Sequence, residues 1–255
     1  AEWKWDGIRV QLSGMRGDVR LYSRTGDDIS AAFPELASAF AGVDAVADGE
    51  LLIVRDGTVA PFNDLQQRLN RKTVTARMMR EHPPHLRLYD LIFKDGDDLR
   101  ALPFGERRAH LESWHRTHRP PLSDLSPLIP FETFADLNAL WQGAREAGIE
   151  GLMLKRRDSP YLAGRPKGHW WKWKREALTL DCVLMYAQRG SGKRSSLYSD
   201  LTFGVWRPRE GSNVQELVPV GKADSGFTDE ELRLLDRYIS THTVETFGPA
   251  RWVQP

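Results

Sequence analysis

The chain has 255 residues, 40% of them hydrophobic and 28% charged, a composition that excludes a disordered protein and is typical of a soluble globular one with room for two domains. Its formal net charge of +1 gives no bulk attraction to nucleic acid, so a nucleic-acid surface would need local clusters of basic residues. The single cysteine, Cys182, excludes an internal disulfide and a cysteine-based zinc site and is typical of a reducing cytoplasm.

No segment of the sequence has the pattern of a membrane anchor or a leader. No apolar run reaches the length of a membrane-spanning helix, and no signal peptide precedes the first motif. Because the sequence begins at Ala1 inside a strand-like segment, we expect a fragment whose natural N-terminus lies further upstream.

Strands and helices alternate along the first part of the chain. The predicted strands are 8–14, 18–24, 45–54 and 86–93, where β-branched or aromatic residues alternate with polar ones and the segment ends at a turn signal. The predicted helices are 33–42, 64–71, 103–118 and 134–148. The third has a proline in its first turn, and the fourth has Gly148 as its C-cap.

The pattern changes after two further strand-like segments, 150–156 and 169–176. Strands are then predicted over 178–188, 200–208 and 215–222, followed by a helix over 228–242 that begins with the capping box of Thr228 and Glu231. The composition shift places a domain boundary near Glu176. We therefore expect an α+β domain with antiparallel sheets over 1–176 and a small β-barrel or sandwich over 177–255.

The opening stretch EWKWDGIR raises a chemical question about Lys4, which lies between two tryptophans and just before an Asp-Gly pair. A solvated lysine needs no such setting, because its charge is stable in water and its stem covers any apolar neighbour. Either Lys4 merely alternates with strand tryptophans, or it is placed to react. In the second case a tight Asp-Gly turn lets Lys4, Asp6 and Arg9 cluster at one strand end.

Later segments supply the groups that a reactive lysine would need. These are SRTG with Arg24, DGELL with Glu50 at the start of a strand, LYDLIF with Tyr89 and Asp90, EGLMLK with Glu150 and Lys155, and WWKWK with Lys172 and Lys174 on one strand face. Together they offer a nucleophile, cations for phosphates, two carboxylates for a hard metal and an aromatic platform for a base. Those are the parts of a nucleotidyl-transfer site.

In this order the six segments resemble motifs I, Ia, III, IIIa, IV and V of the covalent nucleotidyltransferases, and the surrounding sequence is most similar to bacterial ATP-dependent DNA ligases. The resemblance covers nearly the whole chain, and six motifs in the right order are far more specific than one. It implies a nucleotidyltransferase domain with ATP-grasp-like antiparallel sheets and helices over 1–176. It also implies a C-terminally truncated OB-fold β-barrel domain over 177–255, without motif VI, and an N-terminal DNA-binding domain before Ala1.

The resemblance also implies catalytic roles. Lys4 would become adenylated, with Asp6 in the same motif, and Lys172 and Lys174 would engage the α-phosphate. For Lys4 to attack phosphorus its amine must be neutral, whereas free lysine has a pKa of about 10.4. We expect the like charges of Lys172, Lys174, Arg9 and bound Mg²⁺ to lower the pKa of Lys4.

The remaining roles implied by the resemblance concern the nucleotide, the metal and the nick. Glu2 would read the adenine amino group, Tyr89 would stack on adenine, and Met153 would form the opposite wall, with Lys155 also in the nucleotide pocket. Arg9 and Arg24 would contact ribose or the 5′-phosphate of the nick. Glu50 would contact ribose or metal, and Glu150 would help to bind metal.

The implied reaction is nick sealing in duplex DNA with ATP and Mg²⁺, or Mn²⁺, as cofactors. The implied partner is nicked duplex DNA, bound by a monomer in the bacterial cytoplasm at the nucleoid and not at a membrane. The sequence leaves open whether the pathway is replication, repair or recombination, and which proteins recruit the chain. An RNA ligase or a capping-type guanylyltransferase would use the same lysine chemistry, and an inactive nick-binding module is a third possibility. Glu2 favours ATP, because a carboxylate accepts from adenine's amino group where guanine presents a carbonyl.

A basic loop in the segment AQRGSGKRSS is the main candidate for contact with DNA outside these motifs. It departs from a phosphate-binding P-loop, since Ala187 replaces the first glycine and Arg194 replaces the metal-binding Ser or Thr. Arg189, Lys193 and Arg194 are instead expected along a DNA backbone, with a solvated hairpin as the alternative. Plainer interpretations also stay open for Tyr89 as a core aromatic residue and for Lys172 and Lys174 as an exposed strand face.

Overall fold

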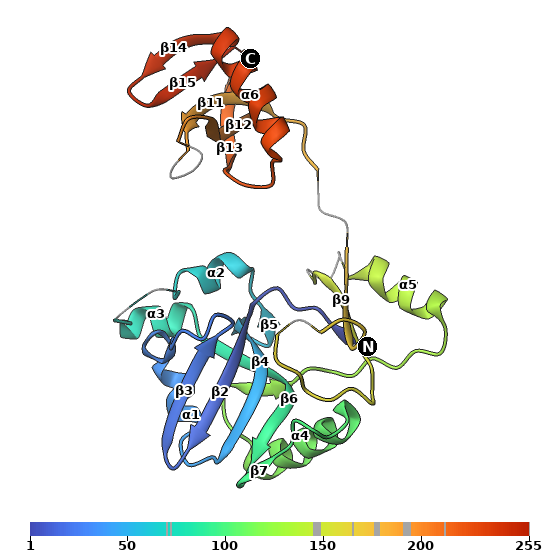
Figure 1. Cartoon of the computed structure of the whole chain (residues 1–255). Coiled ribbons are helices and arrows are strands. Elements are labelled where there is room, and N and C mark those ends of the chain that lie inside the picture. The colour runs from blue at the N-terminus through green and yellow to red at the C-terminus, as the bar shows by residue number, and fades with distance from the viewer. Residues whose placement is uncertain are drawn as a thin grey trace. The chain divides into compact units, whose positions relative to one another are not determined.

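The computed structural model describes residues 1–69, 71, 73–144, 149–164, 166–175, 179–190, 195–211 and 213–254. The chain divides into two compact units, Ala1–Glu176 (unit 1) and Ala177–Pro255 (unit 2), which are treated separately below (Figure 1). None of the described helices is long and apolar enough to cross a membrane.

Unit 1 is built from two sheets and several short helices. Its elements are β1 (Glu2–Trp3), β2 (Ile8–Met15), β3 (Asp18–Ser23), the 3-10 helix η1 (Ser30–Ala32), α1 (Pro34–Ala39), β4 (Ala45–Arg55), β5 (Thr58–Val59), α2 (Phe62–Gln66), α3 (Ala76–Glu81), β6 (Pro84–Lys94), β7 (Asp97–Asp98), α4 (Phe104–His118), β8 (Ser123–Leu125), α5 (Phe134–Gly143), β9 (Gly151–Lys155) and β10 (Trp170–Lys174). The seven-stranded sheet has the order β3-β2-β4-β6-β7, with β5 on β4 and β8 on β6, and the smaller sheet has the order β1-β9-β10. Of these strand pairs only β6 and β8 run parallel. Figure 1 shows β1, at the N-terminus, beside β9.

Alternation along the strands gives the seven-stranded sheet one core face and one polar face. On β2, Val10 and Leu12 are fully buried, whereas Arg9 and Gln11 point to the opposite face. The core face packs against side chains of α1 and α4, including the buried Trp114. The other face is therefore left for polar side chains.

A β-bulge in β6 adds to this polar face. Asp48 pairs with Asp90 and Gly49 pairs with Leu88, so Tyr89 has no partner on β4. Leu88 and Leu91 both belong to the core although they are three residues apart, which regular alternation would not allow. The bulge therefore takes two consecutive side chains, those of Tyr89 and Asp90, out of the core.

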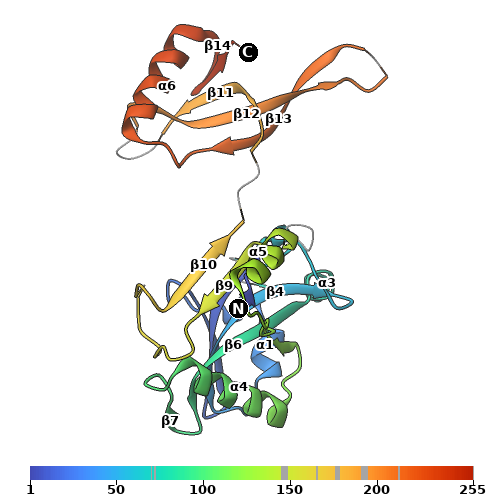
Figure 2. The same ribbon diagram turned by 90° about the vertical axis from the view of Figure 1, so that its right-hand side faces the viewer.

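In its described residues, unit 2 consists of a five-stranded antiparallel sheet and one helix. Its elements are β11 (Val183–Arg189), β12 (Tyr198–Pro208), β13 (Gln215–Ala223), α6 (Asp229–His242), β14 (Thr243–Phe247) and β15 (Ala250–Val253). The strand order is β13-β12-β11-β15-β14, so that β15 returns after α6 to lie beside β11, as in a Greek key. Figure 2 shows β11, β12 and β13 side by side, with α6 in the same unit. A small core of Ala187, Tyr198, Leu201, Ile239 and Val253 lies within this unit.

Neither of two Asp-Gly pairs, Asp6-Gly7 and Asp48-Gly49, forms a tight turn. Gly49 lies inside β4, and Glu50 is therefore in the middle of a strand and not at its start. A Cβ on Gly49 would lie 2.9 Å from a methyl carbon of Leu86 and 3.0 Å from the carbonyl oxygen of Arg87. A Cβ on Gly7 would collide with the carbonyl oxygen of Leu51. Both glycines permit close approach of two backbones, and neither has a positive φ.

Several predicted boundaries also differ from the structure. The helix predicted over 103–118 begins at Phe104 with Pro103 as its N-cap, and the strand predicted from 178 begins at Val183. The helix predicted over 134–148 is α5, and its expected C-cap, Gly148, lies outside the described residues. The helix α3 and the strands β14 and β15 were not predicted. The capping box of Thr228 and Glu231 is present at the start of α6.

Candidate active site

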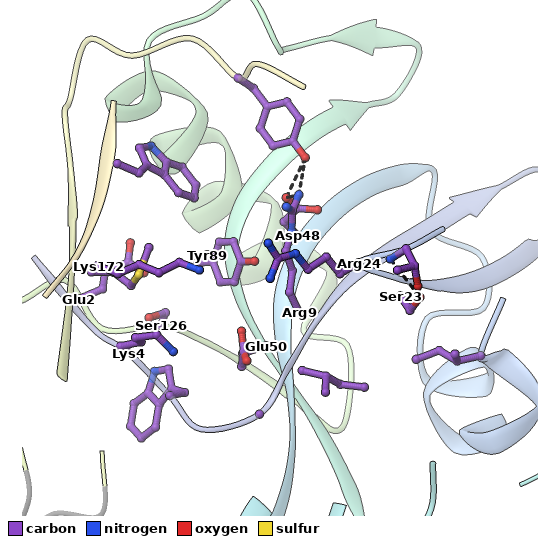
Figure 3. A pocket seen from close by; sticks show the side chains of 18 of the residues that line it. Glu2, Lys4, Arg9, Ser23, Arg24, Asp48, Glu50, Tyr89, Ser126 and Lys172 are labelled. Carbon is purple, nitrogen blue, oxygen red and sulfur yellow. Dashed lines mark hydrogen bonds and ion pairs between the residues drawn. The ribbon is translucent and has the colours of Figure 1, made fainter. Parts of the chain in front are cut away.

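A cavity of about 1440 Å³ in unit 1 is lined by both sheets and by the connection between β9 and β10. Nine of the residues that the sequence predicts for a nucleotidyl-transfer site line it. They are Glu2, Lys4, Arg9, Arg24, Glu50, Tyr89, Met153, Lys155 and Lys172. Figure 3 shows Lys4 and Glu50 facing each other, with Tyr89 and Lys172 nearby and Arg9 beside Asp48. Side chains far apart in the sequence thus meet in one cavity.

Strand register brings three of these side chains together. Met153 in the central strand β9 pairs with Glu2 of β1 on one side and with Lys172 of β10 on the other. Paired residues of neighbouring strands point to the same face of a sheet. The row of Glu2, Met153 and Lys172 therefore forms one wall of the cavity.

Lys4 continues the pairing of β1 with β9. Its amide donates to the carbonyl oxygen of Gly151 at 2.9 Å, and the amide of Glu150 donates to the carbonyl oxygen of Lys4 at 3.0 Å. This pairing sets the two side chains side by side, and they form an ion pair. Burial, and then the positive charge of Lys174, lowers the pKa of Lys4.

Glu50 approaches Lys4 from the seven-stranded sheet. It pairs with Arg9 of β2, and its side chain faces the cavity. Burial raises the pKa of Glu50 to about 7, against the opposing effect of Lys4. The carboxylate makes no hydrogen bond or ion pair with another described residue, so its oxygens remain able to accept a hydroxyl or a cation.

Lys155 has a different environment from that of Lys4. Its ammonium donates to Glu2 at 2.9 Å, and both side chains are almost completely buried. The ammonium also lies 4.3 to 5.0 Å from the ring centres of Tyr89, Phe104 and Trp170. Burial lowers the pKa of Lys155. Lys155 thus holds Glu2 in place behind the aromatic wall.

Some of the residues predicted for the site lie outside the cavity. Asp6 is exposed and does not line it. Glu150 and Lys174 do not line it either, although both act on Lys4, through the ion pair and through charge. Arg24 is exposed on the turn after β3, at the cavity rim, and makes no ion pair with a described residue.

The basic loop belongs to unit 2. Arg189 lies over the ring of Tyr198 at 4.8 Å and donates to the carbonyl oxygen of Ser196. Lys193 and Arg194 lie outside the described residues.

Two residues of the site were missed by the sequence analysis. Asp48 is buried in β4 and accepts hydrogen bonds from Arg9 at 2.6 Å, from Tyr161 at 2.9 Å and from Gln11 at 3.1 Å. Tyr161 comes from the connection between β9 and β10, and its hydroxyl also accepts from Arg9 at 2.7 Å. Asp48 lies inside the strand predicted over 45–54 and received no role there, and no local pattern marks Tyr161.

A metal ion in this cavity would need some of its ligands from the bound substrate. No group of three His, Cys, Asp or Glu side chains in the described part of the chain is arranged to hold one. Glu150 nevertheless forms an ion pair with Lys4, and Glu50 is close enough to raise the pKa of Lys4 by its charge but makes no ion pair with a described residue. Mg²⁺ usually takes one or two carboxylates together with phosphate oxygens and waters, which fits this pair.

The arrangement suits attack by an amine on a phosphorus atom. Lys4 is partly buried with a lowered pKa, which favours the neutral, nucleophilic form. Lys172 supplies positive charge to the same cavity, and Tyr89 offers a ring against which a base can stack.

A family model and the similar proteins of known sequence all point to the same family. The model of the ATP dependent DNA ligase domain matches residues 1–174. A probable DNA ligase of Koribacter versatilis is 38% identical over the whole chain, and so is one of Opitutus terrae. DNA ligase 1 of Korarchaeum cryptofilum is 33% identical, also over the whole chain. The chain spans 47%, 28% and 46% of these three relatives, respectively.

Two solved structures resemble the whole chain. The ligase domain from M. tuberculosis LigD has a TM-score of 0.53, and mycobacterial DNA ligase D complexed with ATP and MES has a TM-score of 0.57. Each is 26% identical in sequence, and each is matched over 79% of its own length.

Proposed function

The chain belongs to the ATP-dependent DNA ligase family, and from this premise we propose that it carries the adenylation chemistry of a DNA ligase that seals nicks in duplex DNA. The observation that carries the proposal is the setting of Lys4. Its amine faces a cavity of nucleotide size, has a lowered pKa, and lies beside two carboxylates that fit a magnesium ion.

The proposed reaction has three steps. The nitrogen of Lys4 loses a proton and bonds to the α-phosphorus of ATP, and the bond from that phosphorus to pyrophosphate breaks. The 5′-phosphate of the nick then attacks the same phosphorus and releases Lys4. Finally the 3′-hydroxyl attacks the 5′-phosphorus of the nick, and AMP leaves.

The position of each side chain supports its proposed role. Tyr89 would stack on adenine, with Met153 opposite and Glu2 accepting from the amino group. Lys172 would contact the α-phosphate, and Lys174 would keep the pKa of Lys4 low. Positioning and charge would provide most of the rate enhancement, as in other phosphoryl transfers.

The other proposed contacts are to the metal, the ribose and the nick. Glu50 and Glu150 would hold Mg²⁺, which when bound would offset the negative charge of the phosphates. Arg9 and Arg24 would contact ribose or the 5′-phosphate of the nick.

For the two units we propose a nucleotidyltransferase domain over 1–176 and an OB-fold domain over 177–255. The Greek-key order of β13, β12, β11 and β15 supports the second assignment, because an OB-fold is a small Greek-key barrel that binds nucleic acid. Arg189 of this unit would lie along the DNA backbone. We further infer a monomer that acts at the bacterial nucleoid in replication, repair or recombination.

The test is closure of a nick that already carries AMP on its 5′-phosphate, in the presence of Mg²⁺. We expect closure of the DNA substrate, decreasing steeply with salt because phosphate contacts release counterions. A nick with a 3′-deoxy end, which lacks the attacking hydroxyl, is the control and should stay open. Closure of a nicked RNA duplex but not of DNA would replace the proposal with an RNA ligase.

A further inference from the structure

Arg9 stands where two cavities meet. It lines the large cavity and also a second cavity of about 390 Å³, which is lined by residues of β2, of β3 and of the turn after β3, among them Arg24. Its side chain is 44% exposed. The same guanidinium can therefore contact a phosphate or a hydroxyl group from either cavity.

Among the described residues, partners hold only one nitrogen of Arg9. Its Nη2 donates to Asp48 at 2.6 Å and to the hydroxyl of Tyr161 at 2.7 Å, while its Nε and Nη1 donate to no described residue. The hydroxyl of Tyr161 in turn donates to the same oxygen of Asp48 at 2.9 Å. The three groups form a closed triangle that fixes one edge of the guanidinium and leaves the other edge for a ligand.

The proton arrangement in this triangle is fixed by its surroundings. Burial, and then the charge of Asp48, raises the pKa of Tyr161, so its hydroxyl stays protonated. Burial by itself would lower the pKa of Arg9, but the negative charge of Asp48 raises this pKa above its usual value, so Arg9 stays charged. Within the triangle Tyr161 therefore donates to Asp48 and accepts from Arg9.

The backbone around Tyr161 is held by the start of α4. The amides of Phe104 and Gly105 donate to the carbonyl oxygens of Ser159 and Arg157, each at 2.8 Å, which satisfies donors that a helix start otherwise leaves open. The amide of Tyr161 itself donates to the carbonyl oxygen of Arg100 at 2.8 Å. The hydroxyl is thus presented from an anchored segment.

We propose that Tyr161 is a positioning residue that, with Asp48, orients Arg9 so that its open edge faces the phosphate or ribose hydroxyl of the bound substrate. The identity of that substrate rests on the proposed function, whereas the orientation of Arg9 does not. Because Tyr161 comes from the connection between β9 and β10, it joins the two sheets across the cavity.

The first test observes Arg9 itself by NMR of its guanidinium protons. A guanidinium held by two partners rotates slowly and gives separate Nη signals, identified by their loss in Arg9→Lys. We expect separate signals in the unsubstituted chain and one averaged signal in Tyr161→Phe, which removes only the hydroxyl. Unchanged Arg9 signals in Tyr161→Phe would overturn the proposal, whether or not the chain is a ligase.

The second test is a double-mutant cycle on closure of the pre-adenylated nick. At saturating DNA we expect Tyr161→Phe to be slower by about tenfold, since misplacing a positioning group costs rate. Tyr161→Phe should add no further loss to Arg9→Ala, because it acts through Arg9. Additive losses would contradict that role. Tyr238→Phe, on the exposed side of α6, is the matched control and should keep the full rate.

A lack of closure by the unsubstituted chain would count against the proposed function alone. The Arg9 spectrum would still decide whether Tyr161 orients Arg9.

Discussion

The two units differ in how deeply they bury apolar side chains. Among the described residues, the core cluster of unit 1 contains twenty buried side chains and that of unit 2 contains five. Unit 2 also leaves large apolar side chains such as Trp206 and Phe247 more than half exposed. Lys4 and Glu50, whose proposed chemistry needs a fixed geometry, belong to the unit with the larger buried core. Unit 2 has a small core and exposes more of its large apolar side chains.

The buried ion pair of Lys155 and Glu2 gives the strongest test of this contrast. Lys155→Met leaves the Glu2 carboxylate buried without a partner, which typically costs about 3–5 kcal/mol. We expect a loss of that size in the free energy of unfolding of unit 1, measured by denaturant titration with tryptophan fluorescence. Adding Glu2→Gln should recover part of it.

The matched control is an exposed ion pair in unit 2, that of Lys222 and Asp200. Lys222→Met should cost less than about 1 kcal/mol. Equal effects of the two lysine substitutions would remove the contrast between the units.

Glu50 should make the stability of unit 1 depend on pH. Its pKa in the folded chain is about 7, above the ordinary value of 4.5, because it is buried. The folded state therefore binds the proton more tightly, so this contribution is fully present below pH 4.5 and is lost as the pH rises towards 7. The loss should be about 3 kcal/mol at most.

Unfolding titrations between these two pH values measure this contribution. Glu50→Gln should flatten the pH dependence of the transition of unit 1 and leave that of unit 2 unchanged. A pH dependence that survives in Glu50→Gln would assign it to another group.

Two identical capping arrangements allow a smaller comparison. Thr133 caps α5 in unit 1 and Thr228 caps α6 in unit 2, each with a carboxylate at the third helical position. Thr133→Ala and Thr228→Ala should each cost about 1 kcal/mol. Unit 2 is smaller and exposes less surface on unfolding, so its free energy of unfolding falls less steeply with denaturant concentration. The same loss of stability should therefore shift the denaturant midpoint of unit 2 further than that of unit 1. Equal midpoint shifts would contradict this.

The sequence predicts the parts of the site that lie in short motifs. Glu2, Lys4, Met153 and Lys172 were each placed in the nucleotide site, and strand register brings them to one cavity. Alternation of polar and apolar residues was enough to assign most strands, because one face of the large sheet is buried.

The missed features depend on contacts between distant segments. Asp48 is buried only because β4 lies between β2 and β6, and Tyr161 meets Arg9 only after the chain has crossed the cavity. The bulge at Tyr89 is likewise a property of the pairing of β4 with β6. Local patterns contain no signal for such pairings.

The most direct test of the central claim, that Lys4 is the nucleophile, is mass spectrometry after incubation with ATP and Mg²⁺. We predict an AMP adduct bound through an acid-labile bond, with fragmentation placing it on Lys4. Lys4→Arg should form no adduct, because arginine stays protonated at working pH, and the variant should keep its fold. An AMP adduct on Lys4→Arg, or one placed on another residue of the unsubstituted chain, would contradict the account.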